Sequence, residues 1–180
     1  MNYPKAKVNV QYMVTTHGKQ TPERIVLHDT ECGELTGVGD IVGVAMYWQR
    51  QGKGLGAHFI IDGEGNLGQG ASSQRITWAV KGHNTRSIHI ELIGYARWRA
   101  PRWLRNKRQL SKLCNLLAYL SDRWGIPLIH STDYGVCMHR DFKGTGADHT
   151  DPGAGFPFDK VLRRAQIRQR RHRKKLLRKK

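Results

Sequence analysis

The sequence predicts a single α/β domain, in which helices flank a central mixed β-sheet, followed by a basic C-terminal tail. The chain has 180 residues, a length that suits one domain, and 38% of them are hydrophobic, which is enough for a core. Short apolar runs are interleaved with longer segments of helical periodicity, the pattern of an α/β fold. The positive charge is concentrated at the C-terminal end.

Three apolar runs predict strands of the sheet. Residues 24–28 end in the polar pair 29–30, which indicates a buried strand that carries His28 to the edge of the sheet. Residues 57–61 run into an Asp-Gly turn, which favours a hairpin. Residues 88–93 are apolar apart from two positions and predict an interior strand.

The strongest helical pattern lies between residues 105 and 124. Its apolar residues recur at steps of three and four and form one stripe: Leu110, Leu113, Leu117, Leu120 and Trp124. Gly125 and Pro127 follow, as expected for a glycine cap with proline just beyond it. This segment therefore predicts a long amphipathic helix.

The remaining elements are shorter. Residues 41–51 predict a helix, residues 128–130 a further strand, and residues 158–166 a last helix. Between them, residues 139–155 have little periodic pattern. Because long aperiodic loops in compact domains are usually functional, we expect this loop to contribute to a site.

The formal net charge of +17 is spread unevenly along the chain. Residues 159–180 hold twelve basic residues and one acidic residue, and beyond residue 167 too few apolar residues remain to pack. We therefore predict a folded domain over residues 1–166 and a basic tail over residues 167–180. Nucleic acid, anionic lipid and anionic cell-wall polymers all satisfy such a charge.

The sequence lacks the marks of export and of membrane insertion. Its first twenty residues contain no apolar run of signal-peptide length, and no segment approaches the roughly 18 apolar residues of a membrane helix. The three cysteines, an odd number at wide spacing, do not form a disulfide framework. We expect a protein that is cytoplasmic when made, with reduced cysteines.

Histidines and one carboxylate stand in suggestive contexts. His28 closes an apolar strand, His139 begins the sequence His-Arg-Asp, and Asp151 lies in the sequence Thr-Asp-Pro-Gly. Two imidazoles and a carboxylate are a common ligand set for catalytic zinc, with a fourth position open for water. The spacing alone leaves a metal site as one of several interpretations.

Several segments in order carry a family resemblance: IVLHDT, AHFIID, HNTRSIHIELIG and HRDF…HTDPG. They are similar to the zinc N-acetylmuramoyl-L-alanine amidases of the peptidoglycan-recognition superfamily, which includes many phage endolysins and the cytosolic amidases of wall recycling. The match spans residues 25–160. The resemblance implies hydrolysis of the amide bond between N-acetylmuramic acid and L-alanine in peptidoglycan.

The resemblance implies that His28, His139 and Asp151 bind Zn²⁺. In some relatives the third ligand is a cysteine. The matching position here is Asp151, so no cysteine is needed, but Cys137 lies two residues from His139 and stays an alternative.

The resemblance also implies two catalytic residues, Glu91 and His149. Many relatives carry a catalytic Tyr at the position of Ala57, and members that lack it resemble this chain in carrying a Glu at position 91. A carboxylate inside an apolar strand has its pKa raised by burial, as a general base near neutral pH requires. The alternative is a structural salt bridge to Arg86 or Arg97. His149 stands where relatives often carry Lys and would stabilise the oxyanion or protonate the leaving amine.

Three further residues are predicted to bind substrate, two of them from the family's substrate groove. His83 and Asn84 match groove positions, and Trp78 can stack on a sugar, although a buried core position is the favoured interpretation for this Trp. His58, His89 and His130 have no predicted role. Strand alternation places His89 on the same sheet face as Glu91, where it could support a metal ligand.

Two other classes of function compete with an amidase. A non-catalytic binder of the same fold would lack a full ligand set, and a nucleic-acid-binding protein would explain the tail but not the ordered motifs. Between a recycling amidase and a phage endolysin, the tail favours the endolysin, because it would hold the enzyme on anionic wall polymer or outer membrane. We expect a monomer with no specific nucleic-acid partner, which acts on the cell wall after release.

Overall fold

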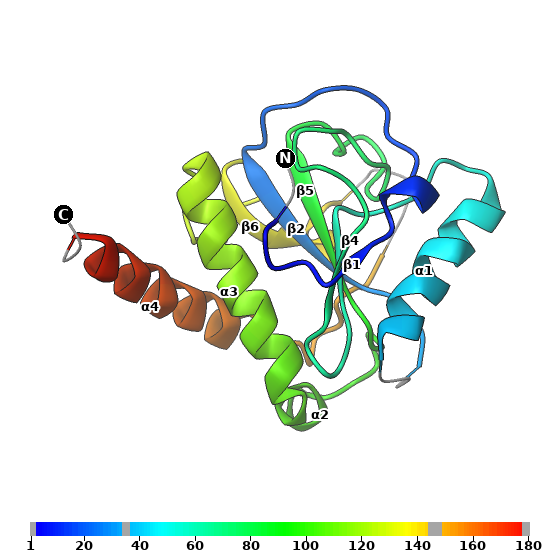
Figure 1. Cartoon of the computed structure of the whole chain (residues 1–180). Helices are drawn as coiled ribbons and strands as arrows, with labels where there is room; N and C mark the ends of the chain where they lie inside the picture. Colours follow the sequence, from blue (N-terminus) through cyan, green and yellow to red (C-terminus); the bar gives the residue numbers. More distant parts are fainter. Residues whose placement is uncertain (1–2, 34–36, 144–148, 178–180) are drawn as a thin grey trace.

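The computed structural model describes residues 3–33, 37–143 and 149–177. A mixed sheet forms its centre, with the strand order β1-β4-β3-β5-β2-β6 (Figure 1). The strands are β1 (Val8–Asn9), β2 (Arg24–Asp29), β3 (Phe59–Ile61), β4 (Leu67–Gln69), β5 (Ser87–Leu92) and β6 (Gly135–Met138). The hairpin β3–β4 is antiparallel and the other pairs are parallel.

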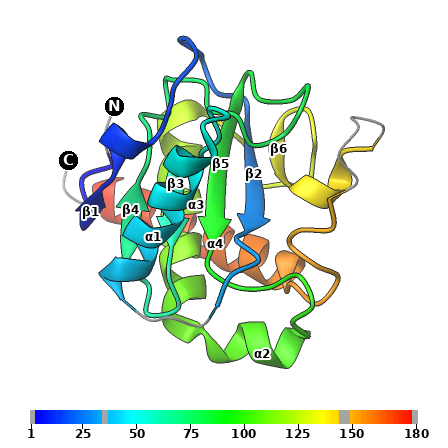
Figure 2. The same cartoon turned by 90° about the vertical axis from the view of Figure 1, so that its right-hand side faces the viewer.

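Helices cover both faces of this sheet. They are α1 (Val38–Gln51), α2 (Ala100–Arg105), α3 (Lys107–Trp124) and α4 (Phe158–Leu177), with 3-10 turns η1 (Gln11–Met13) and η2 (His139–Asp141). Helices α3 and α4 pack on each other and cover one face, whereas α1 lies on the opposite side (Figures 1 and 2). No helix in the described ranges is long and apolar enough to cross a membrane.

Strand alternation sorts the side chains of the two central strands. Ile25, Leu27, Ile88 and Ile90 point into the large core beneath α3 and α4, where they are fully buried. The residues between them face the α1 side, because successive side chains of a strand point to opposite faces. The polar residues of β2 and β5 therefore gather on one face.

Most of the predicted elements are confirmed. Three of the predicted strands, the hairpin at Asp62 and the helix that ends at Gln51 lie within a few residues of the predicted bounds. Helix α3 buries its predicted leucine stripe and ends at Gly125, which adopts the left-handed conformation at φ 72°. Strand β1 and helix α2 are not predicted by the sequence patterns.

The predicted strand at residues 128–130 is wrong. Strand β6 lies at residues 135–138 instead, and only an isolated bridge joins His130 to Val136. Leu128 is buried but Ile129 is 53% exposed, so this apolar run is not an interior strand. The backbone of Val136 donates a hydrogen bond to the carbonyl of Ile129. Residues 128–130 therefore belong to the connection between α3 and β6 and run beside β6.

The predicted end of the last helix is also wrong, because α4 continues through residue 167 to Leu177 without a break. Polar contacts replace apolar packing in this extension. Arg168 donates a hydrogen bond to the carbonyl of Ser111 (2.6 Å), and Arg173 forms an ion pair with Asp122 (2.7 Å). Arg, Lys and Gln are also good helix formers, so the basic sequence favours helix once it is anchored on α3.

Candidate metal centre and adjoining cavity

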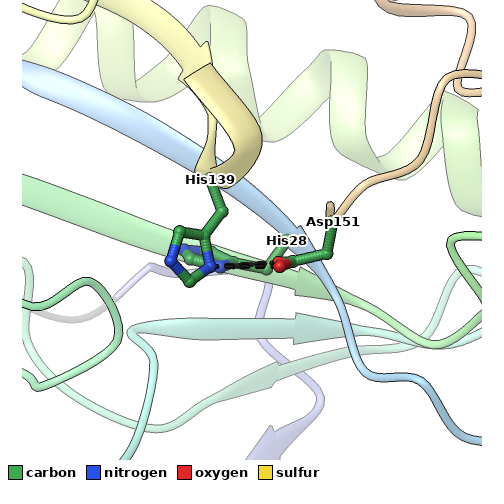
Figure 3. Close-up of side chains that lie close together, drawn as sticks. All are labelled: His28, His139 and Asp151. Atoms are coloured by element: carbon green, nitrogen blue, oxygen red, sulfur yellow. Dashed lines mark hydrogen bonds and ion pairs between the residues drawn. The ribbon is translucent and has the colours of Figure 1, made fainter. Parts of the chain in front are cut away.

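Two histidines and an aspartate converge at one edge of the sheet. His28 is the second-last residue of the buried strand β2, His139 begins η2 directly after β6, and Asp151 lies in the segment that leads to α4. Nδ1 of His28 is 3.1 Å from Oδ2 of Asp151, and Nδ1 of His139 is 3.1 Å from Oδ1 (Figure 3). The structure therefore brings all three predicted ligands together.

Local backbone contacts hold the two loop-borne ligands. The carboxylate of Asp141 accepts a hydrogen bond from the backbone of Met138 (2.8 Å), which fixes the turn that carries His139. The backbone N–H of Arg140 donates to the carbonyl of Asp151 (2.9 Å) and ties the second loop to the first. Two residues later, a Cβ on Gly153 would stand 1.8 Å from the carbonyl oxygen of Ala96, so only glycine fits this approach.

Burial and electrostatics suit this group to a cation. His28, His139 and Asp151 are 2%, 4% and 7% exposed, and one ligand atom from each lies within 4.8 Å of the others. Burial lowers the pKa of His28, against the opposing effect of Asp151. Burial alone would raise the pKa of Asp151, but hydrogen bonds from His139 and His28 lower it well below its ordinary value. Two imidazoles and an anionic oxygen are a donor set that fits zinc.

Cys137 does not belong to this group. Cys137 lies on β6, where it is buried against Val26 of β2, and burial raises the pKa of its thiol to about 12. A protonated thiol is a poor metal ligand, because the thiolate is the form that binds. Among the described residues, the group that can hold a metal is His28, His139 and Asp151.

His149 lies at the exposed edge of the same group. Its ring stacks on His139 with centroids 4.1 Å apart, and its Nδ1 is 3.2 Å from Oδ1 of Asp151. The side chain is 54% exposed, unlike the three candidate ligands. An imidazole in this position can reach both the metal centre and a molecule that approaches from solvent.

Glu91 lies beside His28 in the sheet. The two residues are register partners on β5 and β2, so their side chains leave the same face. Oε2 of Glu91 is buried and has no hydrogen-bond partner in the described part of the chain. Burial, reinforced by the charges of Asp151 and Asp29, raises its pKa well above the ordinary value. These are the features expected of a buried general base.

The alternative salt bridge for Glu91 is not formed in the described structure. Arg86 forms an ion pair with Glu23 instead (2.7 Å), and the guanidinium of Arg97 lies 3.7 Å from the ring centroid of Tyr95.

A cavity of about 610 Å³ adjoins the metal centre between the end of β2 and α1. Glu91 and Asp29 lie in its wall, together with aromatic and acidic side chains of α1 and of the loop after β2. The further lining residues include Glu31, Cys32, Asp40, Tyr47 and Trp48. Sequence reasoning missed these residues, although the position of Asp29 directly after His28 at a strand end was a usable signal.

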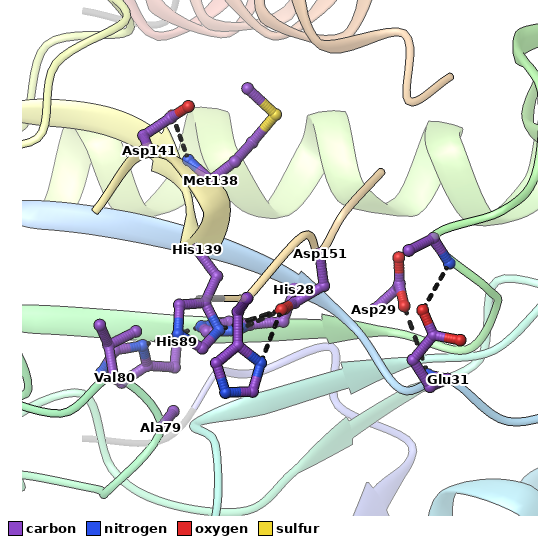
Figure 4. Close-up of polar contacts among 12 residues, drawn as sticks. His28, Asp29, Glu31, Ala79, Val80, His89, Met138, His139, Asp141 and Asp151 are labelled. Carbon is purple, nitrogen blue, oxygen red and sulfur yellow. Dashed lines mark hydrogen bonds and ion pairs between the residues drawn. The ribbon is translucent and has the colours of Figure 1, made fainter. Parts of the chain in front are cut away.

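Asp29 is the most perturbed acid of this cavity that the sequence did not single out. The residue is 6% exposed, and Oδ2 has no partner among the described residues, while Oδ1 accepts a hydrogen bond from the backbone of Glu31 (Figure 4). Burial, followed by repulsion from Asp151 and Glu31, raises its pKa to about 7.

The three residues predicted to bind substrate lie outside this cavity. Asn84 accepts hydrogen bonds from the backbones of Ala79 and Val80 (2.8 Å each), so its side chain shapes its own loop. The ring of His83 lies against Phe142, with centroids 4.4 Å apart. Their contact with substrate stays a prediction.

The expectation that Trp78 is buried in the core is wrong. It is 45% exposed and stacks on the exposed ring of His17, with centroids 3.7 Å apart and an interplanar angle of 7°. Because one face of the indole is covered by His17, only the other can meet a ligand. Sugar stacking by Trp78 stays a prediction.

A row of neutral imidazoles extends from the metal centre into the protein. His89 and His58 are fully buried, and burial lowers the pKa of His58 to about 4. Burial, followed by the charges of His28 and His58, also holds the pKa of His89 well below its ordinary value. No role was predicted for His58. The prediction that His89 shares the face of Glu91 is consistent with the hydrogen-bond distance between His89 and His28.

Solved structures share this fold. N-acetylmuramoyl-L-alanine amidase LysC from Clostridium intestinale URNW is 22% identical with a TM-score of 0.59, over 92% of this chain and 95% of that one. The Ph2119 endolysin of a Thermus scotoductus MAT2119 bacteriophage is 17% identical with a TM-score of 0.62, over 88% and 97%. Drosophila peptidoglycan recognition protein SD is 19% identical with a TM-score of 0.60, over 79% and 80%.

Sequence comparison assigns the family. No match was found among the curated proteins. A family model described as N-acetylmuramoyl-L-alanine amidase matches residues 18–154, which include the three converging side chains and both paired strands that carry His28 and Glu91. The chain therefore belongs to the N-acetylmuramoyl-L-alanine amidase family.

Proposed function

We propose that this amidase is zinc-dependent and acts as a phage endolysin on the bond between N-acetylmuramic acid and L-alanine. The observation that carries the proposal is the convergence of His28, His139 and Asp151. His28 is the register partner of Glu91, which lies in the wall of the neighbouring cavity. A non-catalytic binder of the same fold has no need of a complete donor set. A nucleic-acid-binding protein has no need of the buried carboxyl.

His28, His139 and Asp151 would hold the metal. A zinc ion there supplies a Lewis acid for the amide carbonyl and lowers the pKa of water toward neutrality. The three side chains come from separate segments, and the contacts of Asp141 and of the Arg140 backbone keep them in place. The protein thus orients the donors before a ligand arrives.

Glu91 would act as the general base. In water its carboxylate would be too weak a base near neutral pH, but burial raises its pKa. The side chain lies next to His28 across the strand pair and in the cavity wall, so it can take a proton from a nucleophilic water and hold it for the leaving amine.

His149 would stabilise the developing negative charge on the amide oxygen or protonate the leaving amine. Its exposed ring lies at the edge of the metal centre on the solvent side, where the substrate must enter. A donor at that position acts where charge develops in the transition state.

The basic end of α4 would bind anionic wall polymer or outer membrane. Beyond Arg173, the described residues Lys174 and Lys175 continue the helix as exposed cations, and three further basic residues follow in the sequence. Small soluble muropeptides do not need such a surface, which favours an endolysin over a recycling amidase. The enzyme would act as a monomer on the cell wall after release from the cytoplasm, without a specific nucleic-acid partner.

Assays on purified peptidoglycan test the proposed reaction. Cleavage by an amidase releases free amino groups from the stem peptides and creates no new reducing sugar ends. The appearance of reducing ends would instead indicate a glycosidase and would contradict the proposal.

A further inference from the structure

His28 is in contact with a second buried histidine on the side away from the metal centre. Its Nε2 lies 3.1 Å from Nδ1 of His89, and the two ring centroids are 5.3 Å apart (Figure 4). His89 stands two residues before Glu91 on β5 and is fully buried. Both ring nitrogens of His28 are therefore occupied, one toward Asp151 and the other toward His89.

We propose that His89 is a positioning residue that holds His28 in the orientation and tautomer needed for metal binding. The proposal rests on the proposed function, in which Nδ1 of His28 binds zinc. A neutral imidazole carries one proton, so a ring that gives the lone pair of Nδ1 to a metal has its proton on Nε2. In the described part of the chain, the acceptor within reach of that N–H is Nδ1 of His89.

The surroundings of His89 fix its position. Its backbone N–H donates to Nδ1 of His58 (3.0 Å), and the two rings are stacked with centroids 5.8 Å apart. His58 is in turn held by the carbonyl of Arg75, 2.8 Å from its Nε2. The row therefore gives His89 a fixed place behind His28, as expected of a residue that orients a metal ligand.

The free nitrogen of His89 argues against a role in stability alone. Its Nε2 is buried and has no partner among the described residues. A histidine that only stabilised the fold would be expected to satisfy both ring nitrogens, because a buried polar atom without a partner is unfavourable. His89 satisfies the nitrogen that faces His28 and leaves the other unpaired.

The two histidine ligands differ in this respect. Nε2 of His139 is buried and without a partner in the described structure, whereas Nε2 of His28 faces His89. Removal of the histidine at position 89 should therefore affect the metal site through His28.

Zinc affinity tests the proposal without reference to catalysis. The full-length protein, purified free of metal, is titrated with Zn²⁺ in competition with a fluorescent chelator. His89→Leu removes the acceptor, and we expect its zinc affinity to fall by about 10- to 100-fold, the usual effect of losing such a partner. His89→Asn places an amide oxygen near the position of Nδ1 and should recover most of the affinity.

A core variant controls for general loss of packing. Ile90→Val trims the neighbouring residue on the opposite face of β5, away from His28, and should bind zinc like the wild type. Unfolding temperatures of the metal-free variants show whether each is folded. Histidine ¹⁵N NMR of the zinc-bound wild type should show the proton of His28 on Nε2, which is a readout that requires no variant.

The outcomes separate this proposal from the metal site itself. Wild-type zinc affinity in folded His89→Leu, or a proton on Nδ1 of His28 in the zinc-bound protein, would overturn the role of His89 alone. A wild-type protein that bound no zinc would overturn both the metal site and the role of His89.

Discussion

His28 and Glu91 are register partners on the parallel strands β2 and β5, and both side chains leave the same face of the sheet. This pairing puts a buried carboxyl with a free oxygen beside a candidate metal ligand. Two adjacent strands thus supply two different chemical groups of the site, a ligand and a base.

We predict that Glu91→Gln lowers turnover by roughly 10² to 10⁴, the usual contribution of a positioned general base, and leaves zinc bound. Steady-state rates on peptidoglycan and metal content by mass spectrometry give the two readouts. Glu31→Gln is the matched control, because Glu31 lines the same cavity but its carboxylate accepts a hydrogen bond from the backbone of Ala96. If Glu91→Gln retained near-full activity, Glu91 would be a structural residue.

His149→Ala should lower turnover by about 10² or more if its imidazole stabilises the oxyanion. Zinc content should change little, because the side chain is half-exposed and stands at the edge of the ligand group. His172→Ala removes another exposed histidine that faces an aspartate, far from the site in sequence, and serves as the control. Equal rates in the two variants would remove His149 from the catalytic residues.

Asp29 should make the stability of the metal-free protein depend on pH. Its pKa is raised to about 7 in the folded state, so the folded protein holds this proton more tightly than the unfolded chain does. Its contribution is therefore present below about pH 4 and is lost as the pH rises toward 7, by up to about 4 kcal/mol. Asp29→Asn retains the acceptor for the Glu31 backbone and removes the titration.

Thermal unfolding between pH 4 and pH 8 measures this effect. Relative to the wild type, Asp29→Asn should gain stability as the pH rises and should show little gain at pH 4. Parallel pH profiles for the two proteins would mean that Asp29 is ionised normally in the folded state.

The basic end of α4 should bind intact cell walls in a salt-dependent manner. The sequence suggests deletion of residues 168–180, but that change also removes Arg168 and Arg173, which hold α4 on α3. Deletion of residues 174–180 spares these contacts and removes five basic residues. The shortened protein should sediment less with sacculi at low salt, because it lacks charges whose attraction to the wall is then weakly screened. The difference should shrink at higher salt, since the screening length is only about 8 Å at physiological ionic strength.

Activity on small soluble muropeptides should not change in the shortened protein, since none of the proposed ligands or catalytic residues is removed. Equal sedimentation of both forms at low salt would contradict a role of the tail in wall binding.

The sequence predicted the parts of the fold that depend on local pattern. The alternation in β5 and the leucine stripe of α3 are properties of neighbouring residues, so they can be read directly. The prediction of a strand at residues 128–130 was wrong, because an apolar run does not by itself show whether its side chains are buried. Ile129 is exposed. The predicted end of α4 was wrong because the contacts of Arg168 and Arg173 that hold the longer helix join residues about 50 positions apart, which local patterns do not show.

The same limit applies to the site. The family resemblance implied His28, His139 and Asp151, and the structure brings them together. Spacing could not show that Tyr47 and Trp48 of α1 face the cavity, because that depends on how the helix packs on the sheet. Nor could it show that Trp78 stacks on His17, about 60 residues earlier in the chain.

The most direct test of the proposed function is to identify the bond that is cut and to ask whether cleavage requires a zinc ligand. Purified peptidoglycan is digested with the zinc-loaded wild type or with His28→Ala, and the soluble products are identified by mass spectrometry. We predict stem peptides with a free L-alanine N-terminus from the wild type, and no products and no bound zinc from His28→Ala. Normal product formation by zinc-free His28→Ala, or cleavage at any other bond by the wild type, would contradict the account.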